Sequence, residues 1–178
     1  MTSYTLGQYF NGTFISDGYA AYARYAEQTI GVTHAQCWTH TRRQFVEAQA
    51  AEPDAVATAL NYIGKLYAIE AEIEVKQLSE QSNRDYLLDH SQPLIGAFMQ
   101  WCEYQSQTGN LLPDNPLRKA INYTLKRSAA LNVFLENPDV PLDNYYLERA
   151  VPNTDGAPVT GYFAGLKSAL RIWALSRA

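Results

Sequence analysis

Three short runs of this sequence hold side chains that could carry chemistry. Asp17 follows aromatic and β-branched residues that predict a strand, so its carboxylate lies at the end of that strand. Glu148 lies in the second turn of an expected helix that begins at Asp143 or Asn144. Between them, residues 37–43 combine a cysteine, a histidine and two arginines. Carboxylates are the oxygen ligands that hold Mg²⁺, cysteine and histidine bind zinc, and arginine binds phosphate.

Spacing argues against zinc. Cys37 and His40 are three residues apart, which resembles half of a zinc site. A structural zinc ion needs four ligands, and His34, His90 and Cys102 have no matching spacing. We therefore expect no zinc site, and we expect both cysteines to be unpaired, buried thiols of a reducing compartment.

Each remaining group also has a purely structural interpretation. Asp17 could simply cap the helix that follows it, and composition alone favours that interpretation. Arg42 and Arg43 lie in the first turns of an expected helix, where solvated charges are more common than phosphate sites. Glu148 taken alone is typical of an exposed helix surface. Only the combination of these groups points to a function.

The elements around Asp17 predict where its side chain lies. The sequence predicts a strand ending at Asp17, a helix over residues 20–28 and a second, buried strand within residues 29–38. Two strands joined by a helix form a parallel βαβ unit. Open α/β sheets bind ligands at the carboxyl ends of their strands, so Asp17 lies where a ligand is expected.

The middle of the chain predicts helices throughout. Apolar residues at three- and four-residue spacing, with prolines near the starts, indicate helices over residues 55–78, 93–104 and 117–134. Residues 152–165 hold two prolines and three glycines, so we expect a loop there, followed by an amphipathic segment at residues 166–175.

Composition limits the class of protein and its partners. The chain has 178 residues, of which 47% are hydrophobic, enough for one sizeable core. No apolar run approaches the ~20 residues that cross a bilayer, and the start lacks a signal-peptide pattern, so we expect a cytoplasmic protein without a membrane partner. The net charge is −4. Because neutralising phosphates supplies most nucleic-acid affinity, the chain alone is expected to bind DNA weakly.

Read in order, five separated motifs resemble one family across nearly the whole chain. They are residues 17–22 (DGYAAY), residues 31–32 with 37–45 (CWTHTRRQF), residues 120–125 (AINYTL), residues 143–144 with 148–150 (DN and ERA), and residues 163–165 (FAG). In this order they resemble the bacterial transposases of the insertion-sequence-sixty-six family. The resemblance implies a ribonuclease-H-like catalytic core with an Asp-Asp-Glu triad, interrupted by a helical insertion before the last acidic residue.

The resemblance also implies a fold, a reaction and a role for each candidate residue. We expect a mixed α/β, mostly α chain, in which residues 1–53 and 129–178 form an incomplete ribonuclease-H-like core with few strands and residues 54–128 form the helical insertion. The implied reaction is Mg²⁺-dependent cleavage and transfer of DNA strands at transposon ends, with two ions held by carboxylates. The implied roles are metal-binding and catalytic for Asp17 and Glu148, substrate-orienting for His40, and DNA-binding for Arg42, Arg43 and Arg149.

Two departures from the family pattern change the expected activity. The family's first acidic residue lies well upstream on the first strand, whereas sixteen residues, none of them acidic, precede Asp17 here. Residues 152–160 also lack the cations that the family carries before Phe163. We therefore expect an unpaired sheet edge, an incomplete Mg²⁺ site and a truncated, inactive remnant. The alternatives are a non-enzymatic module that binds or modulates a full-length transposase and, less favoured, an unrelated helical protein.

Overall fold

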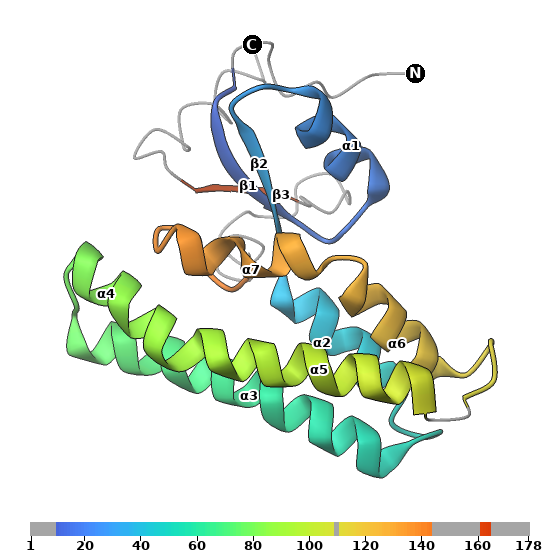
Figure 1. The fold of residues 1–178 in the computed structure, drawn as a ribbon. Coiled ribbons are helices and arrows are strands. Elements are labelled where there is room, and N and C mark those ends of the chain that lie inside the picture. Colours follow the sequence, from blue (N-terminus) through green and yellow to red (C-terminus); the bar gives the residue numbers. More distant parts are fainter. Residues whose placement is uncertain (1–9, 109–110, 144–160, 165–178) are drawn as a thin grey trace, which may run out of the picture.

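The protein consists of a small mixed sheet joined to a larger block of helices (Figure 1). The computed structural model describes residues 10–108, 111–143 and 161–164. The strands are β1 (Gly12–Ser16), β2 (Val32–Gln36) and β3 (Gly161–Ala164), in the order β2-β1-β3. The expectation of a mixed α/β, mostly α chain is confirmed.

The first two strands and helix α1 (Ala20–Gln28) form the predicted parallel βαβ unit. β1 and β2 pair in parallel from Gly12 opposite Val32 to Ser16 opposite Gln36. Because side chains alternate along a strand, successive residues of β1 lie on opposite faces of the sheet. Phe14 packs against Tyr22 and Tyr25 of α1, with ring centroids 5.8 and 6.4 Å away, whereas Ile15 belongs to the main core.

The third strand corrects one expectation. Residues 161–164 were expected within a loop. Instead, β3 pairs antiparallel with β1, from Thr13 opposite Ala164 to Ser16 opposite Gly161. The aromatic pair in the middle of β3 suits an extended conformation, and pairing satisfies the backbone groups of β1 on this side.

After β2, the described elements up to residue 136 are all helical. They are α2 (Trp38–Glu47), α3 (Pro53–Lys76), α4 (Glu80–Tyr86), the π-helical turn η1 (Leu87–Ser91), α5 (Gln92–Thr108), α6 (Pro116–Leu125) and α7 (Ser128–Glu136). α3 and α5 match the predicted helices, whereas α4 was not predicted. α4, η1 and α5 run on without a break. Pro93 has no N–H for the preceding turn, and the helix widens there, with Gln92 N–H donating to the Leu87 carbonyl.

The predicted helix over residues 117–134 is wrong in one respect, because the structure divides it into α6 and α7. The chain turns at Lys126 and Arg127, where Arg127 N–H donates to the carbonyl of Thr124 at 3.0 Å. Ser128 then starts α7. Apolar spacing continues through the turn, so periodicity alone predicts one helix. The turn brings the side chain of Arg127 to the end of β1.

One hydrophobic core joins the sheet to the helices. It extends from Ile15 of β1 through α2, α3, α5, α6 and α7 to Leu142. Figure 1 shows α3 and α5 side by side at the end far from the sheet, with α2, α6 and α7 between. At the centre, Phe98 contacts the rings of Trp38, Phe45, Tyr62 and Trp101. The Trp38 indole also donates to the carbonyl of Leu131 at 3.0 Å.

Both cysteines are buried and neither forms a disulfide, as expected. Burial raises the pKa of the Cys102 thiol to about 12, so this thiol stays protonated and unreactive at neutral pH. None of the described helices combines the length and apolar character that a membrane crossing requires.

Substituting Phe98→Ala tests the shared core. The change removes the central ring of the aromatic cluster and leaves a cavity, so we expect a loss of about 3–5 kcal/mol in the free energy of unfolding. Tyr104→Ala, on the same helix but 62% exposed, is the control and should cost under about 1 kcal/mol. Urea unfolding measures both. Equal losses would show that Phe98 is not central to the core.

Candidate active site

The end of β2 holds two distant segments of the chain next to each other. Cys37 N–H donates to the carbonyl of Ser16 at 3.0 Å, and the next residue, Trp38, donates to the carbonyl of Leu142 at 2.9 Å. Ser16 ends β1, and Leu142 lies in the loop after α7. The residue after each is an aspartate. Two aspartates therefore leave the same edge of the sheet, at the carboxyl ends of the parallel strands.

Asp17 begins the turn between β1 and α1. Its Oδ1 atom accepts the N–H of Tyr19 at 3.1 Å. Tyr19 is the N-cap residue of α1, and no side chain caps this helix, so the interpretation of Asp17 as the N-cap residue is wrong. Within the described part of the chain, the hydrogen bond to Asp17 uses Oδ1 and none is found at Oδ2.

The backbone of this turn is held by one side chain from α6 and one from the turn between α6 and α7. The Tyr123 hydroxyl donates to the carbonyl of Asp17 at 2.7 Å, and Nη2 of Arg127 donates to the carbonyl of Gly18 at 2.9 Å. The Arg127 guanidinium lies over the Tyr123 ring, 3.8 Å from its centroid. Gln36, at the end of β2, donates its amide to the Tyr123 hydroxyl at 3.0 Å. The helical block thus contacts the Asp17 turn directly.

His34 lies under the same turn and is neutral near pH 7. Its Nε2 atom is 2.8 Å from Oγ of Ser16. Burial lowers the pKa of His34, the positive charge of Arg127 lowers it further, and the negative charge of Asp17 opposes both. The ring therefore takes part in hydrogen bonding without adding a cation beside Asp17.

Asp143 is held by one hydroxyl from each of two helices. Its Oδ2 atom accepts hydrogen bonds from Thr39 Oγ1 and from the Tyr67 hydroxyl, both at 2.9 Å. Thr39 lies in the first turn of α2, and Tyr67 lies in the middle of α3. Burial raises the pKa of Tyr67, and the negative charge of Asp143 adds to this, so the phenol stays protonated and donates.

Glu70 adds a second carboxyl group beside Asp143. It follows Tyr67 by one helical turn on α3. Burial, then the negative charges of Asp143 and Glu74, raise the pKa of Glu70 to about 7. A substantial fraction of Glu70 is therefore protonated at neutral pH, which limits repulsion between the two carboxyl groups.

Among the described residues, His40, Arg42 and Arg43 make no hydrogen bond or ion pair with Asp17. His40 lies in the first turn of α2 with its Nδ1 atom buried and unpaired within the described part. Arg42 is exposed. Arg43 is exposed and pairs with Glu47 of the same helix at 3.1 Å. The predicted roles of Glu148 and Arg149 fall outside the described residues.

At this edge, Asp17 is one candidate oxygen ligand for a hard cation such as Mg²⁺. Asp17 offers a carboxylate oxygen at the end of a strand, and carboxylates are the usual protein ligands of Mg²⁺. Among residues 10–108, 111–143 and 161–164, no three histidine, cysteine, aspartate or glutamate side chains cluster as a metal site. Any ion at Asp17 therefore needs a further ligand, and Glu148 is the predicted one.

Sequence reasoning missed the residues that hold the two aspartates, although it contained signals for some of them. Ile63, Leu66 and Ile73 form the buried stripe of α3, and Glu70 occupies a position of that stripe. A carboxylate in an apolar stripe indicates a buried titratable group. Tyr123 and Arg127 are four residues apart in the predicted helix over residues 117–134 and so share its predicted face, but their contact with the Asp17 turn depends on the tertiary fold.

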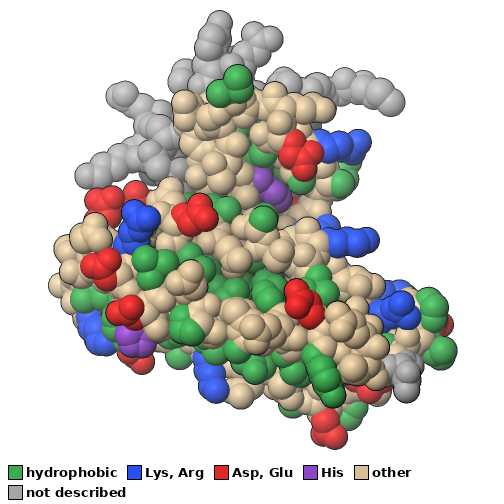
Figure 2. All heavy atoms as spheres, viewed as in Figure 1, with side chains coloured by type: hydrophobic (Ala, Val, Ile, Leu, Met, Phe, Trp, Pro, Cys, Tyr) green, Lys and Arg blue, Asp and Glu red, His purple; other side chains and the backbone are tan. Residues whose placement is uncertain are grey.

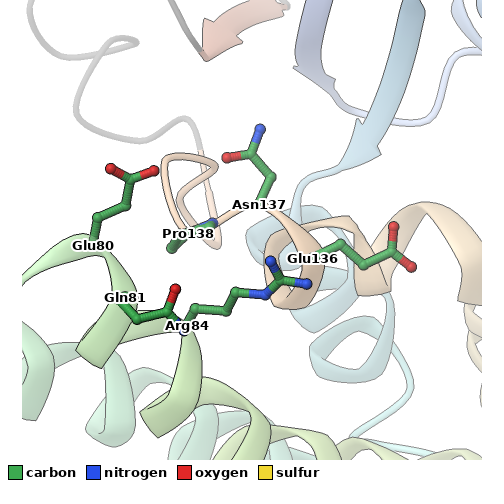
Figure 3. A pocket seen from close by; sticks show the side chains of 6 residues that line it. All are labelled: Glu80, Gln81, Arg84, Glu136, Asn137 and Pro138. Atoms are coloured by element: carbon green, nitrogen blue, oxygen red, sulfur yellow. The ribbon is translucent and has the colours of Figure 1, made fainter.

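Two hollows on the surface of the described part lie away from the Asp17 edge. One, of about 340 Å³, is lined by the side chains in Figure 3, from α4 and from the segment around the end of α7: Glu80, Gln81, Arg84, Glu136, Asn137 and Pro138. The other, of about 360 Å³, lies between α5 and α7. Neither holds any of the predicted site residues.

The family follows from a comparison of the sequence with known families. The sequence pattern of the transposase IS66 family matches residues 2–154. The chain belongs to the IS66 family of transposases. The resemblance found from the motifs is thus confirmed at the level of the family, whose matched region includes Asp17, Asp143 and Glu148.

Curated relatives and solved structures add little on function. Two proteins of Sinorhizobium fredii, the uncharacterized proteins y4qI and y4jD, are each 26% identical to the chain, over 174 and 163 residues. The matches cover 93% and 88% of the chain but 31% of each relative, so the chain spans about a third of their length. No solved structure matches the chain.

Substituting Glu70→Gln tests the raised pKa of Glu70. The folded chain holds this proton more tightly than the unfolded chain, so the stabilisation is full near pH 4.5 and is lost as the pH rises through about 7. Gln cannot titrate, and the variant should lose on the order of 2 kcal/mol of this pH dependence between pH 5 and pH 8. Urea unfolding across that range measures it.

Asp54→Asn is the matched control for Glu70→Gln, because Asp54 is exposed in the first turn of the same helix and does not act on the pKa of Glu70. Its pH profile should follow that of the unsubstituted chain. If the Glu70→Gln profile also follows the unsubstituted one, Glu70 does not titrate near neutral pH.

Proposed function

We propose that this chain forms part of the catalytic domain of a DNA transposase, in which Asp17 and Glu148 hold Mg²⁺ for strand cleavage and transfer. One observation carries the proposal. Neighbouring backbone N–H groups of Cys37 and Trp38 hold the residues before Asp17 and Asp143 at one sheet edge. Glu148 follows Asp143 by five positions, so the segment that bears it starts at the same sheet edge as Asp17.

The chemistry needs converging carboxylates. In strand cleavage and transfer, a water or a DNA 3′-hydroxyl displaces an oxygen of the phosphodiester in line, and divalent ions stabilise the charge on the attacking and leaving oxygens. The role of this chain is to bring oxygen ligands for these ions together at one site. Asp17 contributes Oδ2, while Oδ1 is engaged by the N–H of Tyr19.

The fold proposed for this domain is a partial ribonuclease-H-like core. The parallel β1-α1-β2 unit with an acidic residue at the end of β1 supports it. In this scheme residues 54–128, which include most of α3 and all of α4, α5 and α6, are the helical insertion. No acidic residue precedes Asp17 within residues 1–178, so we propose that this polypeptide alone does not cut DNA.

The proposed DNA contacts are Arg42 and Arg43 on α2 and, by the family motif, Arg149. On the face in Figure 2, acidic and basic side chains are interspersed and hydrophobic ones gather over the helices. With a net charge of −4, the chain offers little general attraction for phosphates. The proposed binding is therefore weak and depends on a few arginines.

Substituting Asp17→Asn and Glu148→Gln in turn tests the metal site. Each change removes one charged ligand, so we expect each to weaken Mn²⁺ binding at least tenfold with little effect on folding. Mn²⁺ electron paramagnetic resonance and the broadening of amide resonances at residues 17–19 measure binding. Asp139→Asn, an exposed aspartate in the loop after α7, is the control and should bind as the unsubstituted chain does.

Each result separates the proposal from its alternative. Full Mn²⁺ binding by both variants would reject Asp17 and Glu148 as ligands. If they are rejected and the chain forms a stable complex with a full-length IS66 transposase in gel filtration, the non-enzymatic module is the better description. DNA cleavage by the chain alone with Mg²⁺, abolished by Glu148→Gln, would contradict the proposed inactivity.

Replacing both Arg42 and Arg43 with Gln tests the DNA contacts. Each phosphate contact contributes about 0.9 to the slope of log affinity against log salt, so the double variant should lower this slope by up to about 2. Fluorescence anisotropy with a short duplex over a salt series measures it. Arg24→Gln, an exposed cation on α1, is the control. An unchanged slope in the double variant excludes α2 from the interface.

A further inference from the structure

We propose that Tyr123 and Arg127, at the turn between α6 and α7, are positioning residues that set the orientation of the Asp17 carboxylate for metal binding. The inference rests on the proposed function, because it assigns a role at the same site. It gives the helical block a direct part in the site. Neither residue is proposed to touch the metal or the DNA.

The first support is the pair of carbonyl groups that these side chains hold. Tyr123 donates to the carbonyl of Asp17 at 2.7 Å, and Arg127 donates to the carbonyl of Gly18 at 2.9 Å. Fixing two successive carbonyls fixes the peptide between them. This restricts the rotation of the Asp17 backbone and hence the direction in which its side chain leaves the strand.

The second support is a chain of two hydrogen bonds, in which Gln36 donates to the Tyr123 hydroxyl and that hydroxyl donates to Asp17. A phenol has one proton, and Tyr123 gives it to the carbonyl of Asp17 at 2.7 Å. The contact with Gln36 must then use an N–H of the Gln36 amide, which donates at 3.0 Å. The amide of a residue buried at the end of β2 therefore orients the hydroxyl that holds Asp17. Phenylalanine at 123 would leave both Gln36 and Asp17 without this partner.

The third support is the fit between Gly18 and these side chains. Gly18 has φ of +87°, a conformation that other residues adopt only with strain. A Cβ atom at this position would lie 2.6 Å from Nε of Arg127 and 2.8 Å from the Tyr123 hydroxyl. The glycine of the Asp-Gly-Tyr run thus allows the side chains of Tyr123 and Arg127 to approach the Asp17 backbone.

The charge of Arg127 also suits a positioning role. Within the described residues it makes no ion pair; its guanidinium lies over the Tyr123 ring at 3.8 Å and bonds carbonyl oxygens. The planar guanidinium can stack and donate at once, whereas a lysine ammonium cannot reproduce that geometry. Arg127→Lys therefore keeps the charge and loses the fixed contact.

The test compares Mn²⁺ affinity in the 178-residue chain and in Tyr123→Phe and Arg127→Lys. Each variant loses one fixed contact to the Asp17 turn, and we expect Mn²⁺ affinity to fall about three- to tenfold. The electron paramagnetic resonance titration gives the affinity, and urea unfolding, measured separately, gives the stability. Tyr104→Phe and Arg118→Lys are the controls, because Tyr104 is exposed on α5 and Arg118 bonds the carbonyl of Leu111 near the start of α6.

The outcomes separate three cases. Weaker Mn²⁺ binding in both variants, with controls unchanged, supports the inference. If Asp17→Asn loses Mn²⁺ binding but Tyr123→Phe and Arg127→Lys bind as the unsubstituted chain does, the inference is overturned while the proposed function stands, whatever their stability. If Asp17→Asn itself has no effect, the proposed function fails.

Discussion

The arrangement of this protein depends on two neighbouring backbone N–H groups at the end of β2. Cys37 binds the carbonyl of Ser16, and Trp38 binds the carbonyl of Leu142. These bonds are short, buried and independent of side-chain type, so they fix two chain segments that are far apart in sequence. The side chain of Trp38 then anchors the same point to α7 through the carbonyl of Leu131. The hydrogen bonds from Thr39 and Tyr67 to Asp143 hold the same segment a little further along the chain.

The helices take part in the site as well as in the core. Tyr67 of α3 donates to the carboxylate of Asp143, and Tyr123 of α6 donates to the backbone of Asp17. Both tyrosines are partly buried, and burial raises the pKa of each, so both remain donors at neutral pH. Since one continuous core joins these helices to the sheet, a shift of the helical block would move both acidic segments. The helices of residues 54–128 therefore share one hydrophobic core with the sheet.

The charged groups at this sheet edge are mainly carboxyl groups, and a cation and a raised pKa limit the repulsion among them. Arg127 is the cation next to the Asp17 turn, and it also helps to lower the pKa of His34. On the other side, Asp143 and Glu70 lie close enough for the pKa of Glu70 to rise to about 7. A proton on Glu70 reduces the repulsion between Glu70 and Asp143.

The sequence alone determined the local elements and the family. The strand before Asp17, the helix after it, the parallel partner strand and the long helix of residues 53–76 follow from side-chain alternation and apolar spacing, which are local properties. The separated motifs led to the IS66 family, which the comparison confirms. Tertiary structure alone decided the pairing of β3 with β1, the turn at Arg127 that divides the predicted helix over residues 117–134, and the contacts of Tyr67 and Tyr123. The strand pairing and the tyrosine contacts join residues far apart in the chain, and such contacts are set by packing and buried hydrogen bonds that no local pattern encodes.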